Sequence, residues 1–287
     1  MSLLSSSPCP HFIGLGAQKS GTSWIDRCLR EHPDVCIPKK EFHFFSRDHH
    51  WANGIDWYRQ QMATCKPGKI VGEFSTSYLT SPEAPTRMAE HCPEARLIVS
   101  LREPVARTFS NYMNDVKGGR LDPNMPFRQA LAEHPEYLEY SRYGDGLERY
   151  LARFPRQRIL VLFHCRMRAE PLASIRAIYD FIGANADFVP ESLNRKVNES
   201  RVPVLPGIDA LITFGAESLR ALGLDRVVRA VSHSGLVDRL RAVNTRQDVR
   251  IQFTAEDRAY VQATLRSDLD KLGGLIGPLP ADWATAR

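Results

Sequence analysis

The chain has 287 residues, of which 43% are hydrophobic and 25% are charged, and its formal net charge is +5. This composition excludes a disordered or fibrous protein and is typical of a globular protein with one large core. We therefore expect a single domain over residues 1–287, with a core over 11–203 and a helical C-terminal extension over 204–287.

The first eight residues contain no basic leader, and no apolar run in them is long enough for a signal peptide or a membrane anchor. We expect a cytoplasmic protein without a transmembrane segment, for which peripheral contact with a membrane stays open. The cysteines form no CxxC pair and no regular framework, so we expect mostly buried, reduced thiols and predict no particular disulfide. The six cysteines are Cys9, Cys28, Cys36, Cys65, Cys92 and Cys165.

Short apolar runs alternate with amphipathic stretches along the chain, which predicts βα units and a mostly parallel sheet. The predicted strands are 12–16, 70–73, 97–101 and 159–163. The predicted helices are 22–31, 81–92, 104–116, 146–154 and 170–182. A capping box at 254–257 begins a further helix, for which Gly273 and Gly274 predict the end. The pattern of 120–143 is too weak for an assignment.

The first strand runs into a glycine-rich turn, with the sequence GLGAQKSGTSW over residues 14–24. Gly16 and Gly21 keep the spacing of the nucleoside-triphosphatase loop, but Lys19 precedes the second glycine instead of following it. A strand, a tight turn and a helix N-terminus direct free backbone N–H groups and a positive dipole end at an anion. The segment therefore predicts a phosphate-binding loop whose lysine is displaced.

A lysine-rich segment, KKEFHFF over residues 39–45, follows the first predicted helix. Glu41 and His43 lie on the same side of the chain if this segment is extended. Two interpretations stay open: Glu41 is a functional carboxylate, or it pairs with a neighbouring lysine while the phenylalanines fill the core. The nearby Asp48, His49 and His50 lack the spacing of zinc ligands, so we expect no metal site.

A second candidate phosphate site follows the apolar run 97–101. Arg102 stands at the carboxyl end of this predicted strand, Pro104 suits the first position of a helix, and Ser110 follows two helical turns later. Ligands of open parallel sheets collect at the carboxyl ends of the strands, so Arg102 and Ser110 are candidates for holding a phosphate. In the alternative, they neutralise a helix end and occupy a solvated face.

Together these three segments resemble sulfotransferases that use 3′-phosphoadenosine 5′-phosphosulfate (PAPS). KSGTSW is similar to their 5′-phosphosulfate loop, the strand–Arg–x–Pro–helix–Ser unit to their 3′-phosphate site, and KEFHFF to the KExHFF stretch of the heparan sulfate sulfotransferases and their bacterial relatives. The resemblance covers about 11–203. It implies a P-loop-like α/β fold of three layers, in which helices flank a central, mostly parallel sheet.

The resemblance also implies a role for each residue that matches a motif. Glu41 is the general base on an acceptor hydroxyl, His43 contacts the substrate, and Lys19 stabilises the leaving phosphate. Trp24 stacks on adenine, and Arg201 belongs to a late basic segment that closes over the 3′-phosphate. The cofactor-binding residues implied in this way are Lys19, Ser20, Gly21, Thr22, Ser23, Trp24, Arg102, Ser110 and Arg201. No metal is required, because lysine and backbone N–H donors can meet the charge of the leaving group.

Two other functions stay open at this stage. A P-loop kinase or ATPase needs a lysine after Gly21 and an acid that holds magnesium, for which Glu73 is the candidate. A non-catalytic nucleotide-binding protein needs only the phosphate-binding loop.

The acceptor is the least determined part of the prediction. Residues 70–78 resemble the family's Glu-Lys-Thr-Pro-x-Tyr strand end, but Phe74 stands in place of the lysine, and Ser46 replaces an acidic residue. These changes imply a neutral or partly apolar acceptor, such as a glycolipid, a lipid alcohol or a small metabolite. They argue against a highly sulfated glycosaminoglycan. Residues 220–250 contain seven arginines and three aspartates. Two interpretations of this region stay open: a solvated surface of helices, or a basic face that attracts an anionic partner. No motif suggests nucleic acid.

Overall fold

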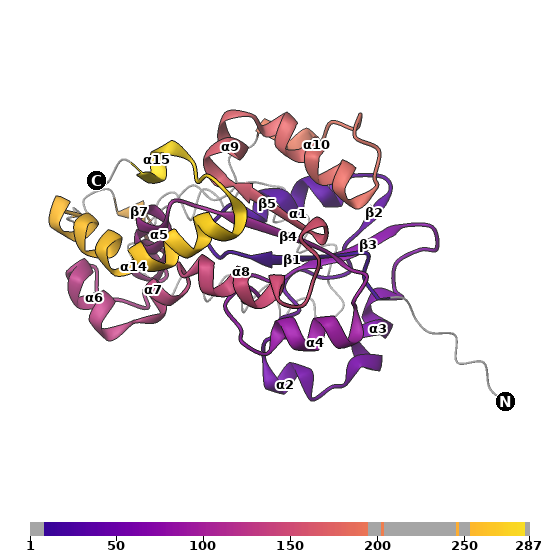
Figure 1. Ribbon diagram of the computed structural model, residues 1–287, viewed down its shortest axis with the longest axis horizontal. Coiled ribbons are helices and arrows are strands. Elements are labelled where there is room, and N and C mark those ends of the chain that lie inside the picture. The colour runs from indigo at the N-terminus through magenta and orange to yellow at the C-terminus, as the bar shows by residue number, and fades with distance from the viewer. Residues whose placement is uncertain (1–8, 195–201, 204–244, 247–252, 285–287) are drawn as a thin grey trace. The chain divides into compact units, whose positions relative to one another are not determined.

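The computed structural model describes residues 9–194, 202–203, 245–246 and 253–284 (Figure 1). The chain divides into two compact units, one formed by 1–108, 135–197 and 258–287 and the other by 109–134 and 198–257. The first unit contains the five-stranded sheet, the glycine-rich turn 14–24 and Arg102, whereas Ser110 belongs to the second unit. The single-domain arrangement over 1–287 stays a prediction.

The first unit is built on a five-stranded parallel sheet with the strand order β2-β3-β1-β4-β5. Four strands confirm the predicted apolar runs: β1 (Phe12–Gly16), β3 (Ile70–Phe74), β4 (Arg96–Leu101) and β5 (Ile159–Phe163). The fifth, β2 (Val35–Cys36), was not predicted, because two residues are too few to show a periodic pattern. The predicted α/β fold with a central parallel sheet is confirmed.

The sheet separates two hydrophobic cores, because side chains alternate between its faces along each strand. In β4, Leu97 and Val99 belong to one buried cluster and Ile98 to the other. The helices α1, α9 and α10 supply the cluster around Ile98, whereas α3, α4 and α8 supply the opposite one (Figure 1). The result is a three-layer arrangement of helices, sheet and helices.

Each predicted helix is present, with shifts of a few residues at its ends. The described helices of the first unit are α1 (Thr22–Glu31), α2 (Asp48–Trp51), α3 (Ile55–Met62), α4 (Ala84–His91), α7 (Glu136–Glu139), α8 (Tyr143–Leu151), α9 (His164–Ala169), α10 (Pro171–Ile182) and α15 (Ala281–Ala284). Two short 3-10 helices are η1 (Arg156–Arg158) and η2 (Glu191–Asn194). The short helices α2, α3 and α9 were not predicted, because fewer than three turns give a weak 3.6-residue pattern.

Two helices have residues in both units: α5 (Pro104–Lys117) and α14 (Ala255–Ile276). The predicted start of α14 is confirmed, since Thr254 and Asp257 bond each other's backbone and side chain. Its predicted end is wrong. The helix continues through Gly273 and Gly274 and stops at Ile276, before Gly277, whose φ is +87°.

The described part of the second unit is organised around aromatic side chains. Phe109 and Tyr112 of α5 pack with Phe127, the first residue of α6 (Phe127–Glu133), and with Phe253. Two short antiparallel strands, β6 (Val202–Pro203) and β7 (Thr245–Arg246), also belong to this unit. The stretch 120–143 therefore contains α6 and α7, and most of the arginine-rich region 220–250 lies outside the described residues.

One cysteine pair corrects the expectation of reduced thiols. Cys36 in β2 and Cys65 after α3 form a disulfide with a Cα–Cα distance of 6.0 Å, whereas Cys9, Cys28, Cys92 and Cys165 are free. The partners are 29 residues apart and join two separate elements, which the spacing of cysteines in the sequence does not reveal.

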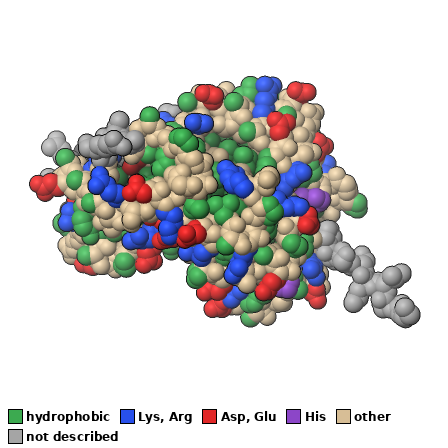
Figure 2. All heavy atoms as spheres, viewed as in Figure 1, with side chains coloured by type: hydrophobic (Ala, Val, Ile, Leu, Met, Phe, Trp, Pro, Cys, Tyr) green, Lys and Arg blue, Asp and Glu red, His purple; other side chains and the backbone are tan. Residues whose placement is uncertain are grey.

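The surface has an ordinary distribution of charge on the face shown in Figure 2, where acidic and basic side chains are interspersed. In the part of the chain that the structure describes, every helix is too short or too polar to span a bilayer.

Candidate active site

The turn between β1 and α1 forms a cradle of backbone groups. Gly16 and Gly21 have φ values of +117° and +90°, which a residue with a side chain rarely adopts. A Cβ atom at Gly16 would lie 2.8 Å from the backbone oxygen of Thr76. Glycine is therefore needed at the first position both for its conformation and for the close approach of the segment after β3.

The N-terminus of α1 is open to an anion. Gly21 occupies its N-cap and no side chain caps the helix, so its first backbone N–H groups lack the partners that a capping residue supplies. Ser20 and Thr22 are buried beside this end, and Ser100 of β4 donates a hydrogen bond to the backbone oxygen of Ser20. The predicted loop residues 20–23 thus surround a helix N-terminus with its positive dipole end.

Arg102 lies against this loop, as the sequence predicts for the end of β4. Its Nη1 donates a 3.2 Å hydrogen bond to the backbone oxygen of Lys19. The side chain is half-buried, and burial lowers its pKa. No carboxylate among the described residues forms an ion pair with it. A desolvated cation with a neutral partner fits a bound anion, since an anion would supply the missing counter-charge.

His164 is a site residue that the sequence analysis missed. It begins α9, directly after β5, and its ring lies close to Gly21, since a Cβ built there would be 3.2 Å from the ring carbon Cδ2. Burial, helped by the charges of Arg102 and Arg168, lowers the pKa of His164 to about 4. The only available signal was its position at the carboxyl end of a predicted strand. The imidazole is neutral at physiological pH and marks a positive environment beside the loop.

Glu41 and His43 form the second part of the site. The Nε2 atom of His43 lies 3.5 Å from Oε2 of Glu41. The hydrogen bond from His43 and the charges of His43, Lys40 and Arg47 hold the pKa of Glu41 below its usual value, against the effect of burial. Glu41 is thus a carboxylate at neutral pH, as a general base must be. On the other side of Glu41, Lys40 donates a 2.9 Å hydrogen bond from Nζ to the hydroxyl of Ser23 in α1.

A cavity of about 150 Å³ brings the two motifs together. Ala17 and Gln18 of the β1–α1 turn line it together with Glu41 and His43. The side-chain oxygen Oε1 of Gln18 is buried and has no hydrogen-bond partner among the described residues. A ligand with a donor group would satisfy this atom.

A larger cavity of about 410 Å³ shares four lining residues, Arg47, Ser77, Thr80 and Tyr140, with the smaller one. Hydroxyl and charged side chains dominate its walls. The other lining residues are Ser46, Ser81, Pro82, Glu83, Glu139, Arg142, Asp145 and Arg149.

The roles of three predicted cofactor residues stay predictions. Trp24 is half-buried, and its indole Nε1 donates a 3.0 Å hydrogen bond to the backbone oxygen of Leu193. Ser110 lies in α5 within the second unit, so its pairing with Arg102 stays a prediction. Arg201 lies outside the described residues.

Phe74 does not have the position on which the apolar-acceptor prediction depends. Its side chain is 1% exposed and packs against Phe12 on the α1 side of the sheet. Its ring lies over Gly14, where a Cβ atom would be 1.9 Å from the ring. Phe74 therefore offers no apolar surface to an acceptor.

Among the residues that the structure describes, no group of three or more His, Cys, Asp or Glu side chains is arranged to hold a metal ion. The expectation of metal-free chemistry stays a prediction. Glu73, the candidate magnesium ligand of a kinase or ATPase, is completely buried and accepts hydrogen bonds from Tyr58, Ser75 and Tyr78. These three hydrogen bonds all come from neutral hydroxyl groups.

A family model described as a sulfotransferase domain matches residues 10–205. That match covers more than half of the chain and includes every segment of the site above. The chain belongs to the sulfotransferase family.

Several characterised relatives resemble this sulfotransferase. Heparan sulfate glucosamine 3-O-sulfotransferase 3B1 of Mus musculus is 31% identical over 188 residues, which are 62% of this chain and 47% of the relative. Heparan sulfate glucosamine 3-O-sulfotransferase 6 of Homo sapiens is 32% identical over 183 residues, 61% of this chain and 52% of the relative. The chain thus spans about half the length of the curated relatives it matches.

A bacterial structure is similar over nearly the whole chain. The crystal structure of a sulfotransferase from Alicyclobacillus acidocaldarius has a TM-score of 0.69 and 25% sequence identity, and the alignment covers 96% of this chain and 99% of that one. The P-loop-like fold predicted for this sulfotransferase is therefore confirmed.

Proposed function

We propose that this protein transfers a sulfuryl group from PAPS to a hydroxyl group of a hydrophilic acceptor. One observation carries the proposal: Ala17 and Gln18 of the turn that leads into the open N-terminus of α1 line the same small cavity as Glu41. A donor anion held at the loop would have its reacting sulfur near a base, which is the arrangement that transfer to a hydroxyl requires.

The loop is suited to the 5′-phosphosulfate end of PAPS. The backbone N–H groups of residues 20–23 and the side chains of Lys19 and Thr22 would bind its oxygens, with Trp24 near adenine. PAPS, when bound, supplies the sulfuryl group and a nucleotide phosphate as the leaving group. Lys19 would then stabilise the charge that develops on this phosphate.

The half-buried Arg102 is suited to the 3′-phosphate, because its guanidinium group has no acidic partner among the described residues. Ser110 and Arg201 remain our proposed further ligands of that phosphate. His164, beside Gly21, is neutral and can contribute a hydrogen bond to the nucleotide without adding charge.

Glu41 is the proposed general base. Its carboxylate would accept the proton of the acceptor hydroxyl as the bond between that oxygen and sulfur forms and the bond between sulfur and the phosphate oxygen breaks. His43 lies 3.5 Å from Glu41 and would fix the orientation of the carboxylate or contact the acceptor. Because the hydroxyl proton becomes acidic only during the transfer, a base of low pKa in the correct position is sufficient.

The larger cavity supports a hydrophilic acceptor. Its serine and threonine hydroxyls and its charged side chains can bind the hydroxyls of a sugar. The heparan sulfate relatives act on a carbohydrate, in agreement with this reading. We therefore place carbohydrate acceptors before the glycolipid, lipid or small-metabolite acceptors expected from the sequence.

The kinase or ATPase alternative finds little support in the site. Lys19 precedes Gly21, and Glu73 is buried among three hydroxyl donors. A non-catalytic nucleotide-binding protein would have no use for a carboxylate beside the loop. Turnover is the measurement that separates it from an enzyme.

The test is transfer of ³⁵S-labelled sulfate from PAPS to a panel of acceptors in the presence of a metal chelator. The panel contains unsulfated and sulfated polysaccharides, oligosaccharides, glycolipids and lipid alcohols. We expect labelled product from one or more carbohydrate acceptors. Transfer only to lipid alcohols would overturn the acceptor class, and a protein that binds PAPS but transfers to none of the panel would support the non-catalytic alternative.

A further inference from the structure

Glu73 is a buried acidic residue to which the proposed chemistry gives no role. It lies in β3, is 0% exposed, and accepts hydrogen bonds from three hydroxyl groups. Tyr58 and Tyr78 donate to its Oε1 atom at 3.0 and 2.6 Å, and Ser75 donates to Oε2 at 2.7 Å. Burial raises the pKa of Glu73, and these three donors oppose that rise by stabilising the carboxylate.

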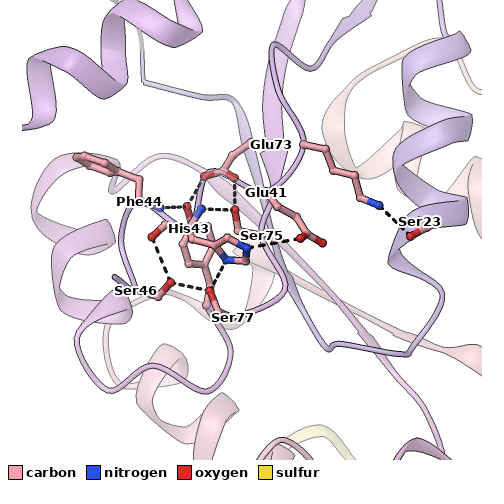
Figure 3. A network of polar contacts seen from close by, with 10 residues as sticks. Ser23, Glu41, His43, Phe44, Ser46, Glu73, Ser75 and Ser77 are labelled. Carbon is pink, nitrogen blue, oxygen red and sulfur yellow. Dashed lines mark hydrogen bonds and ion pairs between the residues drawn. The ribbon is translucent and has the colours of Figure 1, made fainter. Parts of the chain in front are cut away.

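Two of the three hydroxyls continue to the segment that carries the candidate base (Figure 3). The hydroxyl of Ser75 accepts a 2.9 Å hydrogen bond from the backbone N–H of His43. The hydroxyl of Tyr78 accepts a 3.0 Å hydrogen bond from the backbone N–H of Phe44. Glu73 is therefore linked to two consecutive backbone groups of the segment through two hydroxyl bridges.

The carboxylate determines the direction of both bridges. A serine or tyrosine hydroxyl has one proton, and when that proton is donated to Glu73 the oxygen can act only as an acceptor. Each oxygen is then available to a backbone N–H donor, which has no other partner there. An uncharged residue at position 73 would leave the hydroxyl protons free to turn toward the segment and oppose its N–H groups.

The segment held in this way has an unusual backbone. Glu41 and His43 have φ values of +58° and +51°, in the left-handed region that residues with side chains seldom occupy. The N–H of Glu41 donates a 2.9 Å hydrogen bond to the backbone oxygen of Phe74, next to Glu73. Such a conformation persists only where surrounding contacts enforce it.

We propose that Glu73 is a positioning residue for the sulfuryl transfer: through the hydroxyls of Ser75 and Tyr78 it holds the backbone of His43 and Phe44, and thereby the Glu41 carboxylate, in the left-handed arrangement that faces the phosphosulfate loop. The catalytic meaning of this assignment rests on the proposed function. The positioning itself is a property of the fold and can be measured separately.

The chain supplies a matched pair of variants. Tyr58 and Tyr78 are both fully buried and both donate to the same oxygen of Glu73. Of these two tyrosines, only Tyr78 has a hydroxyl that also accepts a hydrogen bond from the described segment 39–45. Tyr58→Phe and Tyr78→Phe therefore remove the same chemical group and the same bond to Glu73, but only the second removes a bridge.

The first measurement is backbone amide hydrogen exchange over residues 39–47 in the full chain, without nucleotide. We expect Tyr78→Phe and Ser75→Ala to accelerate exchange in this segment by about tenfold or more over Tyr58→Phe, because each removes a bridge to a protected N–H. Ser75→Thr, which keeps a hydroxyl, should restore the protection. Equal exchange in Tyr78→Phe and Tyr58→Phe would overturn the positioning role.

The second measurement is the rate of sulfate transfer at saturating PAPS and acceptor, together with affinity for 3′-phosphoadenosine 5′-phosphate (PAP). We expect Tyr78→Phe and Ser75→Ala to lower kcat by about 10–100-fold, because small misplacements of a base have effects of this size. PAP affinity should change by less than about twofold. Tyr58→Phe should keep nearly the full rate.

The two measurements separate the possible failures. A wild-type chain that transfers no sulfate would refute the proposed function, and exchange would still decide whether Glu73 positions the segment. A chain whose bridge variants exchange faster but retain full kcat would refute the catalytic meaning of the inference while leaving the proposed function intact. Glu73→Gln is less informative, because it also changes the buried hydrogen bond from Tyr58, which is not part of a bridge.

Discussion

Lys19 shares its backbone conformation with Glu41 and His43. Lys19 has a φ of +66°, and among the described residues these three are the non-glycine residues with positive φ. Each such residue costs about 1–3 kcal/mol relative to an ordinary conformation. The three residues that the sequence nominated as catalytic are thus the three that the fold holds in a strained conformation, which supports their assignment to one site.

Replacing Lys19 and replacing Glu41 should have different effects on PAP affinity and on the rate of transfer. Lys19→Ala should weaken PAP binding and lower the rate, because the ammonium group would contact the nucleotide before and during the transfer. Glu41→Gln should lower kcat by about 10²–10⁴ and leave PAP affinity nearly unchanged, as expected for loss of a general base. Steady-state kinetics and calorimetric titration with PAP would separate the two effects.

Lys39→Ala is the control for this pair, because Lys39 is an exposed lysine whose Nζ lies 5.9 Å from the centre of the Phe42 ring. It should behave like the wild-type protein. If Glu41→Gln retains nearly full activity, the base is another group, and His43 becomes the first candidate.

His164 should make the stability of the protein depend on pH. Its pKa is lowered from 6.5 to about 4 in the folded chain, so the unfolded chain binds a proton that the folded chain excludes. The free energy of unfolding should therefore fall as the pH drops from about 6.5 to 4, by up to about 3 kcal/mol from this residue.

Chemical denaturation of the wild type and of His164→Gln at several pH values would measure this contribution as the difference between the two profiles. A bound anion beside Arg102 would favour protonation of the imidazole, so PAP should reduce the difference. Parallel profiles for the two proteins, with and without PAP, would contradict the assignment of His164 to the site.

At the scale of elements, the connection between β2 and α3 carries the segment with Glu41 and His43, and the disulfide between Cys36 and Cys65 closes it. A cross-link over 29 residues restricts the unfolded chain and commonly stabilises a protein by about 2–4 kcal/mol. Two kinds of restraint therefore act on the segment 39–45. The disulfide closes the longer connection 36–65 that contains it, and the hydroxyl bridges from Glu73 hold its backbone.

Cys36→Ser should lower the free energy of unfolding by about 2–4 kcal/mol, measured by denaturant titration without reductant. With reductant, the wild type should lose a similar amount, and the variant should lose nothing further. Cys165→Ser is the control, because Cys165 is a free, half-buried cysteine. Six alkylated thiols in wild-type protein unfolded without reductant would contradict this prediction, because only four cysteines are free.

At the scale of the whole molecule, PAP should bind and stabilise the chain in the presence of a metal chelator, because Lys19, Arg102 and the N-terminus of α1 supply the positive field. A ligand at a hundredfold excess over its Kd stabilises the folded state by about 2.7 kcal/mol, which thermal unfolding would detect.

Arg102→Ala should remove the preference for PAP over adenosine 5′-phosphate, since that preference depends on the 3′-phosphate. If chelation abolishes binding, or if ATP with magnesium competes more effectively than PAP, the kinase or ATPase alternative gains the advantage. An unchanged preference in Arg102→Ala would remove Arg102 from the 3′-phosphate site.

The sequence by itself determined the sheet and the loop at its edge. Buried parallel strands are continuous apolar runs, and a strand followed by glycines and an amphipathic helix specifies its own local geometry, so β1, β4 and the β1–α1 turn were predictable. Lys19, Glu41 and Arg102 were predicted as site residues for the same reason, because each belongs to a short contiguous motif.

Only the tertiary structure decided what lies around these motifs. The burial of Phe74 against Phe12, the approach of His164 to Gly21, the disulfide of Cys36 with Cys65 and the bridges from Glu73 to residues 43 and 44 all join segments far apart in the chain. Local patterns carry no information on such pairings, because they arise when strand order brings distant segments to one edge of the sheet. For that reason the contiguous motifs of the donor site could be predicted from the sequence, whereas the surroundings of the acceptor could not.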